Sequence, residues 1–139
     1  MPDGERLQQL GILLLRTALG VMFFAHGFIL KFWTIGMEGT VRFFGVLGFP
    51  GWLAYPTAVA ETVGGVMLVL GIQTRWVALA LLPVVLGALW VHSGNGWLFE
   101  AKHGGWEFPL YLVVLCIAQA MLGDGAHALS PSWPERGRR

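Results

Sequence analysis

Charged residues are scarce in this chain. Lys, Arg, Asp and Glu together make up 12% of its 139 residues, whereas a soluble domain carries about 25%. More than half of the residues, 55%, are hydrophobic. The composition therefore predicts that most of the protein surface meets lipid. The net charge is only +1, so no strong electrostatic field favours nucleic acid as a partner.

Cysteine is almost absent as well. Cys116 is the single cysteine, so it can form no internal disulfide and has no second thiol for redox exchange. We expect it to be structural. HxxxH and CxxC spacings are missing, which argues against a metal site. The sequence also contains no phosphate loop, nucleotide fingerprint or Ser-His-Asp order, and these absences argue against the common soluble enzyme classes.

Long apolar runs dominate what is present. A helix needs about 20 apolar residues to cross a bilayer. The runs cover residues 10–30, 52–72, 76–92 and 108–122, and the last two are short. Most of the tryptophans fall near the ends of these runs, as an aromatic belt would place them. The sequence thus predicts an all-α membrane protein, a four-helix transmembrane bundle whose first partner is the lipid bilayer.

The expected topology follows from the number of spans and the positions of the basic residues. An even number of spans puts both termini on one side. That side would hold Arg6, Arg75, Arg136, Arg138 and Arg139, and the other would hold Lys31, Arg42 and Lys102. The positive-inside rule then predicts cytoplasmic termini. We expect one domain over residues 1–130 and a disordered cytoplasmic tail over residues 131–139.

Two loops on the outer side have unusual compositions. Residues 36–45 are apolar and aromatic, yet too short and too charged to span a bilayer. We expect a short interfacial helix there, in the first outer loop. Residues 93–106 combine four glycines with Trp97, Phe99 and Trp106. Glycines allow tight turns, so this loop should lie over the mouth of the bundle with its aromatic side chains as lids.

Two charged residues interrupt the apolar runs. By the helical period, Arg16 shares a face with Gly20 and Gly27 in the first run, and Glu61 shares a face with Gly65 in the second. Small residues let membrane helices approach closely, and charges inside a bilayer seek a partner. The pattern predicts a buried ion pair between Arg16 and Glu61. Such a pair would either hold the bundle together or serve as a proton relay or a polar floor under a ligand.

A second group of ionisable residues falls at the expected outer end. It comprises His26, Lys31, His92, His103 and Glu107. A histidine can carry a proton, ligate a metal or donate to a quinone carbonyl. We predict a ligand site formed by His26, Lys31, His92 and Glu107, with Trp106 as part of its lid. Two alternatives stay open, namely a haem bridging His26 and His92, and interfacial histidines without a ligand. No metal site is predicted.

Charges and glycines recur in a definite order along the chain. The pieces are Arg16-x3-Gly20-x5-His26-Gly27-x3-Lys31, then Glu61-x2-Gly64-Gly65-x2-Leu68-x2-Gly71-x3-Arg75, then Gly104-Gly105-Trp106-Glu107. As a combination this order resembles the DoxX family of small bacterial and archaeal membrane proteins. The similarity covers residues 10–130. Its matching positions are Arg16, Gly27, Lys31, Glu61, Gly65 and Glu107.

The resemblance to DoxX proteins carries functional expectations. It implies a four-helix membrane bundle in the bacterial or archaeal inner membrane. The namesake is similar to a subunit of a thiosulfate:quinone oxidoreductase, and other relatives are linked to oxidative and thiol stress. An accessory or quinone-facing subunit of a membrane redox complex is thus implied, with soluble or membrane oxidoreductases as partners. Because this chain lacks a cysteine pair, any thiol chemistry would have to come from a partner or the substrate.

Two other classes of function remain open from the sequence. In one, an oligomer of this chain forms a small transporter or channel lined by Arg16, Lys31 and Glu61. In the other, the small-residue faces bind neighbouring helices and the chain is an assembly partner without catalysis. The sequence does not decide whether the chain is an enzyme.

Overall fold

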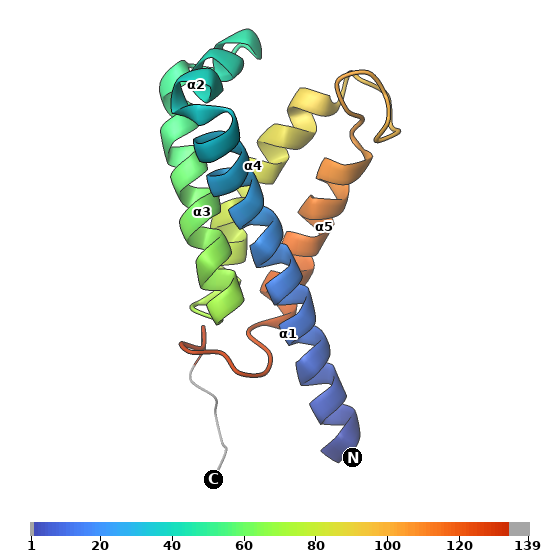
Figure 1. The fold of residues 1–139 in the computed structure, drawn as a ribbon. Helices are drawn as coiled ribbons and strands as arrows, with labels where there is room; N and C mark the ends of the chain where they lie inside the picture. Colours follow the sequence, from blue (N-terminus) through green and yellow to red (C-terminus); the bar gives the residue numbers. More distant parts are fainter. Residues whose placement is uncertain (1, 134–139) are drawn as a thin grey trace.

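The described part of the chain, residues 2–133 of the computed structural model, is a bundle of helices with no strand (Figure 1). Its elements are α1 (Pro2–Phe24), η1 (Ala25–Thr34), α2 (Gly36–Val46), η2 (Gly51–Leu53), α3 (Ala54–Leu70), α4 (Thr74–His92) and α5 (Glu107–Leu122). The predicted all-α fold class is confirmed. The expected spans recur with small changes in their ends, except that the first is longer on both sides. The expected interfacial segment is helical and corresponds to α2.

The first span does not end where its apolar run ends. It continues from α1 into η1, where the backbone widens to π-type hydrogen bonding up to Thr34. Only then does Gly36, with a φ of 77°, turn the chain into α2. Glycine adopts a φ of this sign without the steric cost that a Cβ would bring. As a consequence, Lys31 is part of a helix rather than of a loop.

The helices suit a bilayer in length and surface. Three segments are long and apolar enough to span a membrane, namely Asp3–Thr34, Gly51–Leu70 and Thr74–His92, while α5 is apolar but shorter. Large apolar side chains point outward along them. Leu14, Val59 and Met121 are 71%, 60% and 74% exposed. Such an outer surface would be untenable in water but matches lipid, so the chain is a multi-pass membrane protein.

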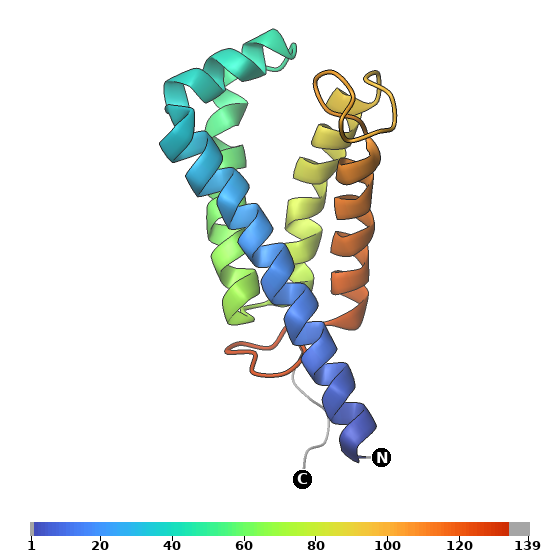
Figure 2. The same cartoon turned by 45° about the vertical axis from the view of Figure 1, so that its right-hand side comes forward.

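The helices pack as two pairs that diverge toward one end. One pair is α1 with α3, and the other is α4 with α5. Figure 2 shows the pairs close together near the α3–α4 turn and far apart near α2. Buried apolar side chains fill the region where the pairs meet, and Cys116 is among them with 1% exposure. Cys116 therefore has a structural position, and the other end of the bundle is left wider.

Glycines determine how closely α1 approaches α3. A Cβ added at Gly65 would lie 2.6 Å from the Phe24 nitrogen and 2.7 Å from the Gly20 oxygen. A Cβ at Gly27 would lie 2.7 Å from the Thr62 nitrogen and 2.8 Å from the Glu61 Cβ. These spaces are too small for any side chain, so the backbones themselves are in contact. This contact sets the register between the two helices.

We expect the Gly65→Ala variant to lose about 1–3 kcal/mol of unfolding free energy, because the extra methyl overpacks the α1–α3 contact. Gly11→Ala is the matched control. It places the same methyl on α1, where no atom lies within 4 Å, and should be neutral or stabilising by up to about 1 kcal/mol. Thermal unfolding in detergent measures both. Equal stability of the two variants would contradict the close packing.

The chain after α5 folds back beneath the bundle. We call residues 123–133 the C-terminal strap (Figure 1). Its backbone bonds to α1 through Ala126 N and Gln9 O at 3.1 Å, and to the end of α3 through Leu129 N and Leu70 O at 3.2 Å. Ser132 is 9% exposed. Ser132, in the segment expected to be a disordered tail, is thus packed against the bundle, and residues 134–139 lie outside the described residues.

Both described ends of the chain lie at the same end of the bundle, away from α2 (Figure 1). The N-terminus of α1 and the C-terminal strap meet there through Gln9 and Ala126. This arrangement agrees with an even number of crossings. The assignment of that end to the cytoplasm stays a prediction.

Candidate functional site

A cavity of about 490 Å³ lies in the wider end of the bundle. Residues of η1, α2, α3, α4 and α5 contribute to its wall, which is mostly apolar. Its polar residues are His26, Lys31, Thr40, Thr57, Glu61 and His92. Pro83 and Gly87 line it on α4, where their small size leaves room. Volumes of about 300–1,000 Å³ with few polar groups are typical of small-molecule sites.

An ion pair lies in the wall of this cavity. Lys31 Nζ is 2.9 Å from Glu61 Oε2, and the two side chains are 16% and 5% exposed. Lys31 Nζ also donates to the backbone oxygen of His26 at 3.3 Å. A carboxylate so deeply buried in an apolar bundle needs such a partner, because an isolated charge there would be very costly.

The predicted ion pair between Arg16 and Glu61 is wrong. The packing of α1 and η1 against α3 places Glu61 level with Gly27, and Gly27 lies eleven positions beyond Arg16 along the helix. At 1.5 Å per residue this distance is about 16 Å, beyond the reach of the side chain. Lys31 lies one helical turn beyond Gly27 on the same face and reaches Glu61 instead. The sequence pattern indicated the buried charges but not which of them meet.

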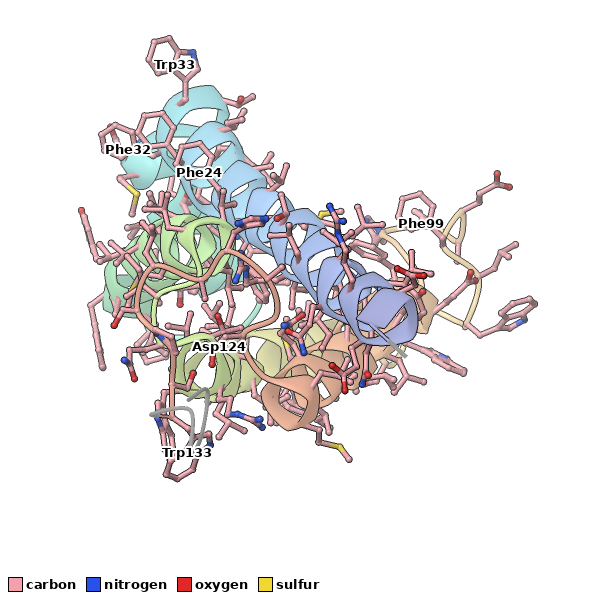
Figure 3. All side chains as sticks on the ribbon, turned by 90° about the horizontal axis from the view of Figure 1, so that it is seen from below. Phe24, Phe32, Trp33, Phe99, Asp124 and Trp133 are labelled. Carbon is pink, nitrogen blue, oxygen red and sulfur yellow. The ribbon has the colours of Figure 1, made fainter. Side chains whose placement is uncertain are left out.

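Arg16 anchors the C-terminal strap at the opposite end of the bundle. It is 1% exposed, and its Nη1 and Nη2 donate to the backbone oxygens of Asp124 at 2.5 Å and Ala126 at 3.2 Å. The Asp124 carboxylate in turn accepts from Thr74 N at 3.2 Å and from the backbone and hydroxyl of Ser132 at 2.9 and 2.8 Å. Figure 3 views the bundle from this end and labels Asp124. Sequence reasoning missed Asp124 entirely.

Two histidines line the cavity from different elements. His26 Nδ1 lies 2.9 Å from the Met22 oxygen, and His92 Nδ1 lies 3.1 Å from the Gly104 oxygen. Both belonged to the predicted ligand site, and the structure brings them into one cavity with Lys31. His26 also stacks on Phe108 of α5, with ring centroids 6.5 Å apart.

The two remaining predicted ligand residues lie elsewhere. Trp106 and Glu107 line a second, more open hollow together with Trp97, Phe99 and Tyr111. Neither residue lines the cavity. The next two residues of the chain, Phe108 and Pro109, line it instead. Successive residues of a helix point in directions about 100° apart, so a small rotation of α5 decides which of them face inward. The predicted set is therefore divided between two sites.

Thr40 is a cavity residue that the sequence did not single out. It is 1% exposed, and its hydroxyl lies 2.9 Å from the Lys31 oxygen and 2.8 Å from the Gly36 oxygen. These contacts hold α2 across the end of η1. No sequence signal distinguished Thr40 from other polar residues. Thr57, by contrast, lies four residues before Glu61 on the same helical face and could have been assigned to the site.

The comparison with known families agrees with this architecture. Residues 11–94, more than half of the chain, match the family model described as DoxX. The chain belongs to the DoxX family. The matched stretch includes Lys31, Glu61 and His92 of the cavity. The family predicted from the order of charges and glycines is thereby confirmed.

A curated relative supports the same assignment over most of the DoxX chain. It is a Bacillus subtilis (strain 168) protein named "Putative oxidoreductase CatD", 37% identical over 123 residues, which cover 88% of this chain and 87% of the relative. No solved structure matches the chain.

Proposed function

We propose that this DoxX protein is the quinone-binding subunit of a membrane redox complex. The observation that carries the proposal is the Lys31–Glu61 pair in the wall of a largely apolar cavity of about 490 Å³, inside a membrane-spanning bundle. A quinone has a polar ring and an apolar tail, and this cavity offers both environments. The name of the relative supports a redox setting.

The donor set of the cavity fits a quinone headgroup. A lysine ammonium carries three N–H donors. In Lys31 one is directed to Glu61 and one to the His26 oxygen, which leaves one for a ligand carbonyl. Phe23, Phe43 and Phe108 provide apolar walls for the ring. Lys31 would thus hold and orient the headgroup, while its pairing with Glu61 keeps the site neutral overall.

A bound quinone would supply the redox chemistry, taking up two electrons and two protons to become a quinol. The electrons would have to come from a partner oxidoreductase, because a chain with one cysteine cannot cycle a disulfide. The contribution of this chain would be to bind the headgroup, exclude water from it and hold exchangeable protons at Lys31 Nζ and the carboxyl of Glu61. Co-purification of a redox enzyme from native membranes would test the partnership.

We expect the purified protein to bind a short-chain quinone saturably, and we expect the double variant Lys31→Met with Glu61→Leu to bind it at least about tenfold more weakly. Loss of a charged hydrogen bond of about 1.5–3 kcal/mol accounts for this factor. The double variant is used because it leaves no unpaired charge in the cavity. Isothermal titration calorimetry in lipid nanodiscs is the measurement.

The matched control for this experiment is Lys102→Met. Lys102 is an exposed lysine of the outer loop and does not line the cavity, so its replacement should leave the affinity unchanged. Equal affinity of the double variant and the wild type would refute the site. Absence of binding together with ion flux in liposomes would favour a transporter instead.

A further inference from the structure

Both cavity histidines, His26 and His92, contact a backbone carbonyl oxygen through Nδ1. A carbonyl oxygen can only accept a hydrogen bond. The contacts of His26 Nδ1 with the Met22 oxygen and of His92 Nδ1 with the Gly104 oxygen therefore require the hydrogen on Nδ1. In each neutral ring the remaining nitrogen, Nε2, is then an acceptor.

Asn95 does not reverse this assignment for His92. Its Nδ2 lies 3.4 Å from His92 Nδ1, but it lies closer to two carbonyl oxygens, Gly104 O at 2.9 Å and His103 O at 3.2 Å. Those two contacts use both N–H groups of the amide. The Nδ1 hydrogen of His92 thus remains directed to the Gly104 oxygen.

The cavity consequently offers a ligand more acceptors than donors. Within residues 2–133 the Nε2 atoms of His26 and His92 make no hydrogen bond. Glu61 accepts from Lys31 through Oε2, and the contacts among the described residues leave its Oε1 uncommitted. Against these three acceptors stand the one uncommitted N–H of Lys31 and the hydroxyl of Thr57, which can donate or accept. A ligand that has only hydrogen-bond acceptors cannot pair with the acceptor atoms of this cavity.

We infer that the cavity selects the reduced, dihydroxy form of its ligand over the oxidised, dicarbonyl form. This inference rests on the quinone site proposed above. A quinol presents two O–H donors to the acceptors, whereas the two carbonyls of a quinone can accept only from Lys31 and Thr57 and leave the two imidazoles and the Glu61 Oε1 unpaired. A site built to accept from a hydroxyl rejects an analogue that lacks it, because its own buried groups are then left unpaired.

Selective binding of the quinol has a consequence for the redox reaction. In the balanced step, the quinone gains two electrons from the partner and two protons to give the quinol. Tighter binding of the product raises the reduction potential of the bound couple, by about 30 mV for each tenfold preference. The cavity would therefore draw electrons from the partner onto the quinone.

The experiment compares three ligands of nearly equal size in nanodiscs without oxygen, at about pH 8, where an ordinary imidazole is neutral. They are duroquinone, duroquinol and the dimethyl ether of duroquinol, which has no donor. We expect duroquinol to bind about tenfold more tightly than either of the others. The comparison in the wild-type protein is independent of whether any variant folds.

Variants assign the preference to the histidines. His26→Phe and His92→Phe keep an aromatic ring but remove Nε2, and each should reduce the preference for duroquinol several-fold. The control is His103→Asn, because His103 lies on the outer loop outside the cavity and asparagine tolerates its φ of 67°. Circular dichroism verifies that each variant is folded.

The possible outcomes separate the two proposals. The inference is supported if the wild-type protein binds duroquinol most tightly and if the folded histidine variants lose this preference. Duroquinone binding as tight as or tighter than duroquinol overturns the inference and leaves the quinone site standing. An unchanged preference in both histidine variants also overturns it. Binding of none of the three ligands overturns the quinone site itself.

Discussion

Replacement of Glu61 by leucine should destabilise the protein by about 3–5 kcal/mol, the cost typical of removing one partner of a buried ion pair. The Lys31 side chain is only 16% exposed, so its ammonium would remain in an apolar wall without a counter-charge. The double variant Lys31→Met with Glu61→Leu should recover most of this loss, because it leaves no unpaired charge.

Denaturant unfolding of the wild type, the two single variants and the double variant gives the coupling energy directly. The control is Glu38→Leu. Glu38 pairs with Arg42 at 2.6 Å on α2, but these side chains are 83% and 76% exposed, so the loss should not exceed about 1 kcal/mol. If the double variant is as unstable as the sum of the single ones, Lys31 and Glu61 do not stabilise each other and the observed pairing is contradicted.

The second large effect is expected at the opposite end of the bundle. Arg16→Met should lower the unfolding free energy by about 3 kcal/mol, because it removes two charged hydrogen bonds, each of about 1.5–3 kcal/mol, to the partly buried backbone oxygens of Asp124 and Ala126. The strap would lose its anchor to α1. Limited proteolysis should then cleave within residues 123–133 well before the helices.

Arg6→Met is the matched control, since Arg6 is an exposed arginine of the same helix, and it should change neither stability nor cleavage. Ligand binding offers a second check. The strap lies at the end of the bundle away from the cavity, so folded Arg16→Met protein should retain the ligand affinity of the wild type. Protease resistance equal to that of the wild type would show that Arg16 does not hold the strap.

The membrane architecture was determined by the sequence alone, because it depends on local composition. Apolar runs of near-spanning length specify helices wherever they occur in a bilayer, and the observed helices follow those runs within a few residues, apart from the earlier start of α1 at Pro2. The turn between α3 and α4 is equally local. Gly71, with a φ of 71°, ends α3 through hydrogen bonds from its own N–H to Leu68 and from Ile72 to Met67. The family could also be predicted, because charges and glycines keep their order along the chain.

The candidate site was predictable only in part, because it depends on how helices rotate and slide against one another. His26, Lys31 and His92 were predicted and share the cavity, while Trp106 and Glu107 were predicted and lie outside it. A helical period shows which residues share a face of one helix, but it does not show which face of α5 turns inward. Only the packed structure sets that rotation.

The partners of the buried charges were likewise decided by tertiary structure. Contact of Gly65 with Gly20, and of Gly27 with Glu61, sets the register that gives Glu61 to Lys31 rather than to Arg16. Arg16 then meets Asp124, a residue 108 positions away along the chain. Sequence alone established that these charges needed burial with partners, since hydrocarbon tolerates no lone charge. The identity of those partners depends on how closely two helices approach at their glycines. That distance is a property of the packed pair and cannot be read from either helix alone.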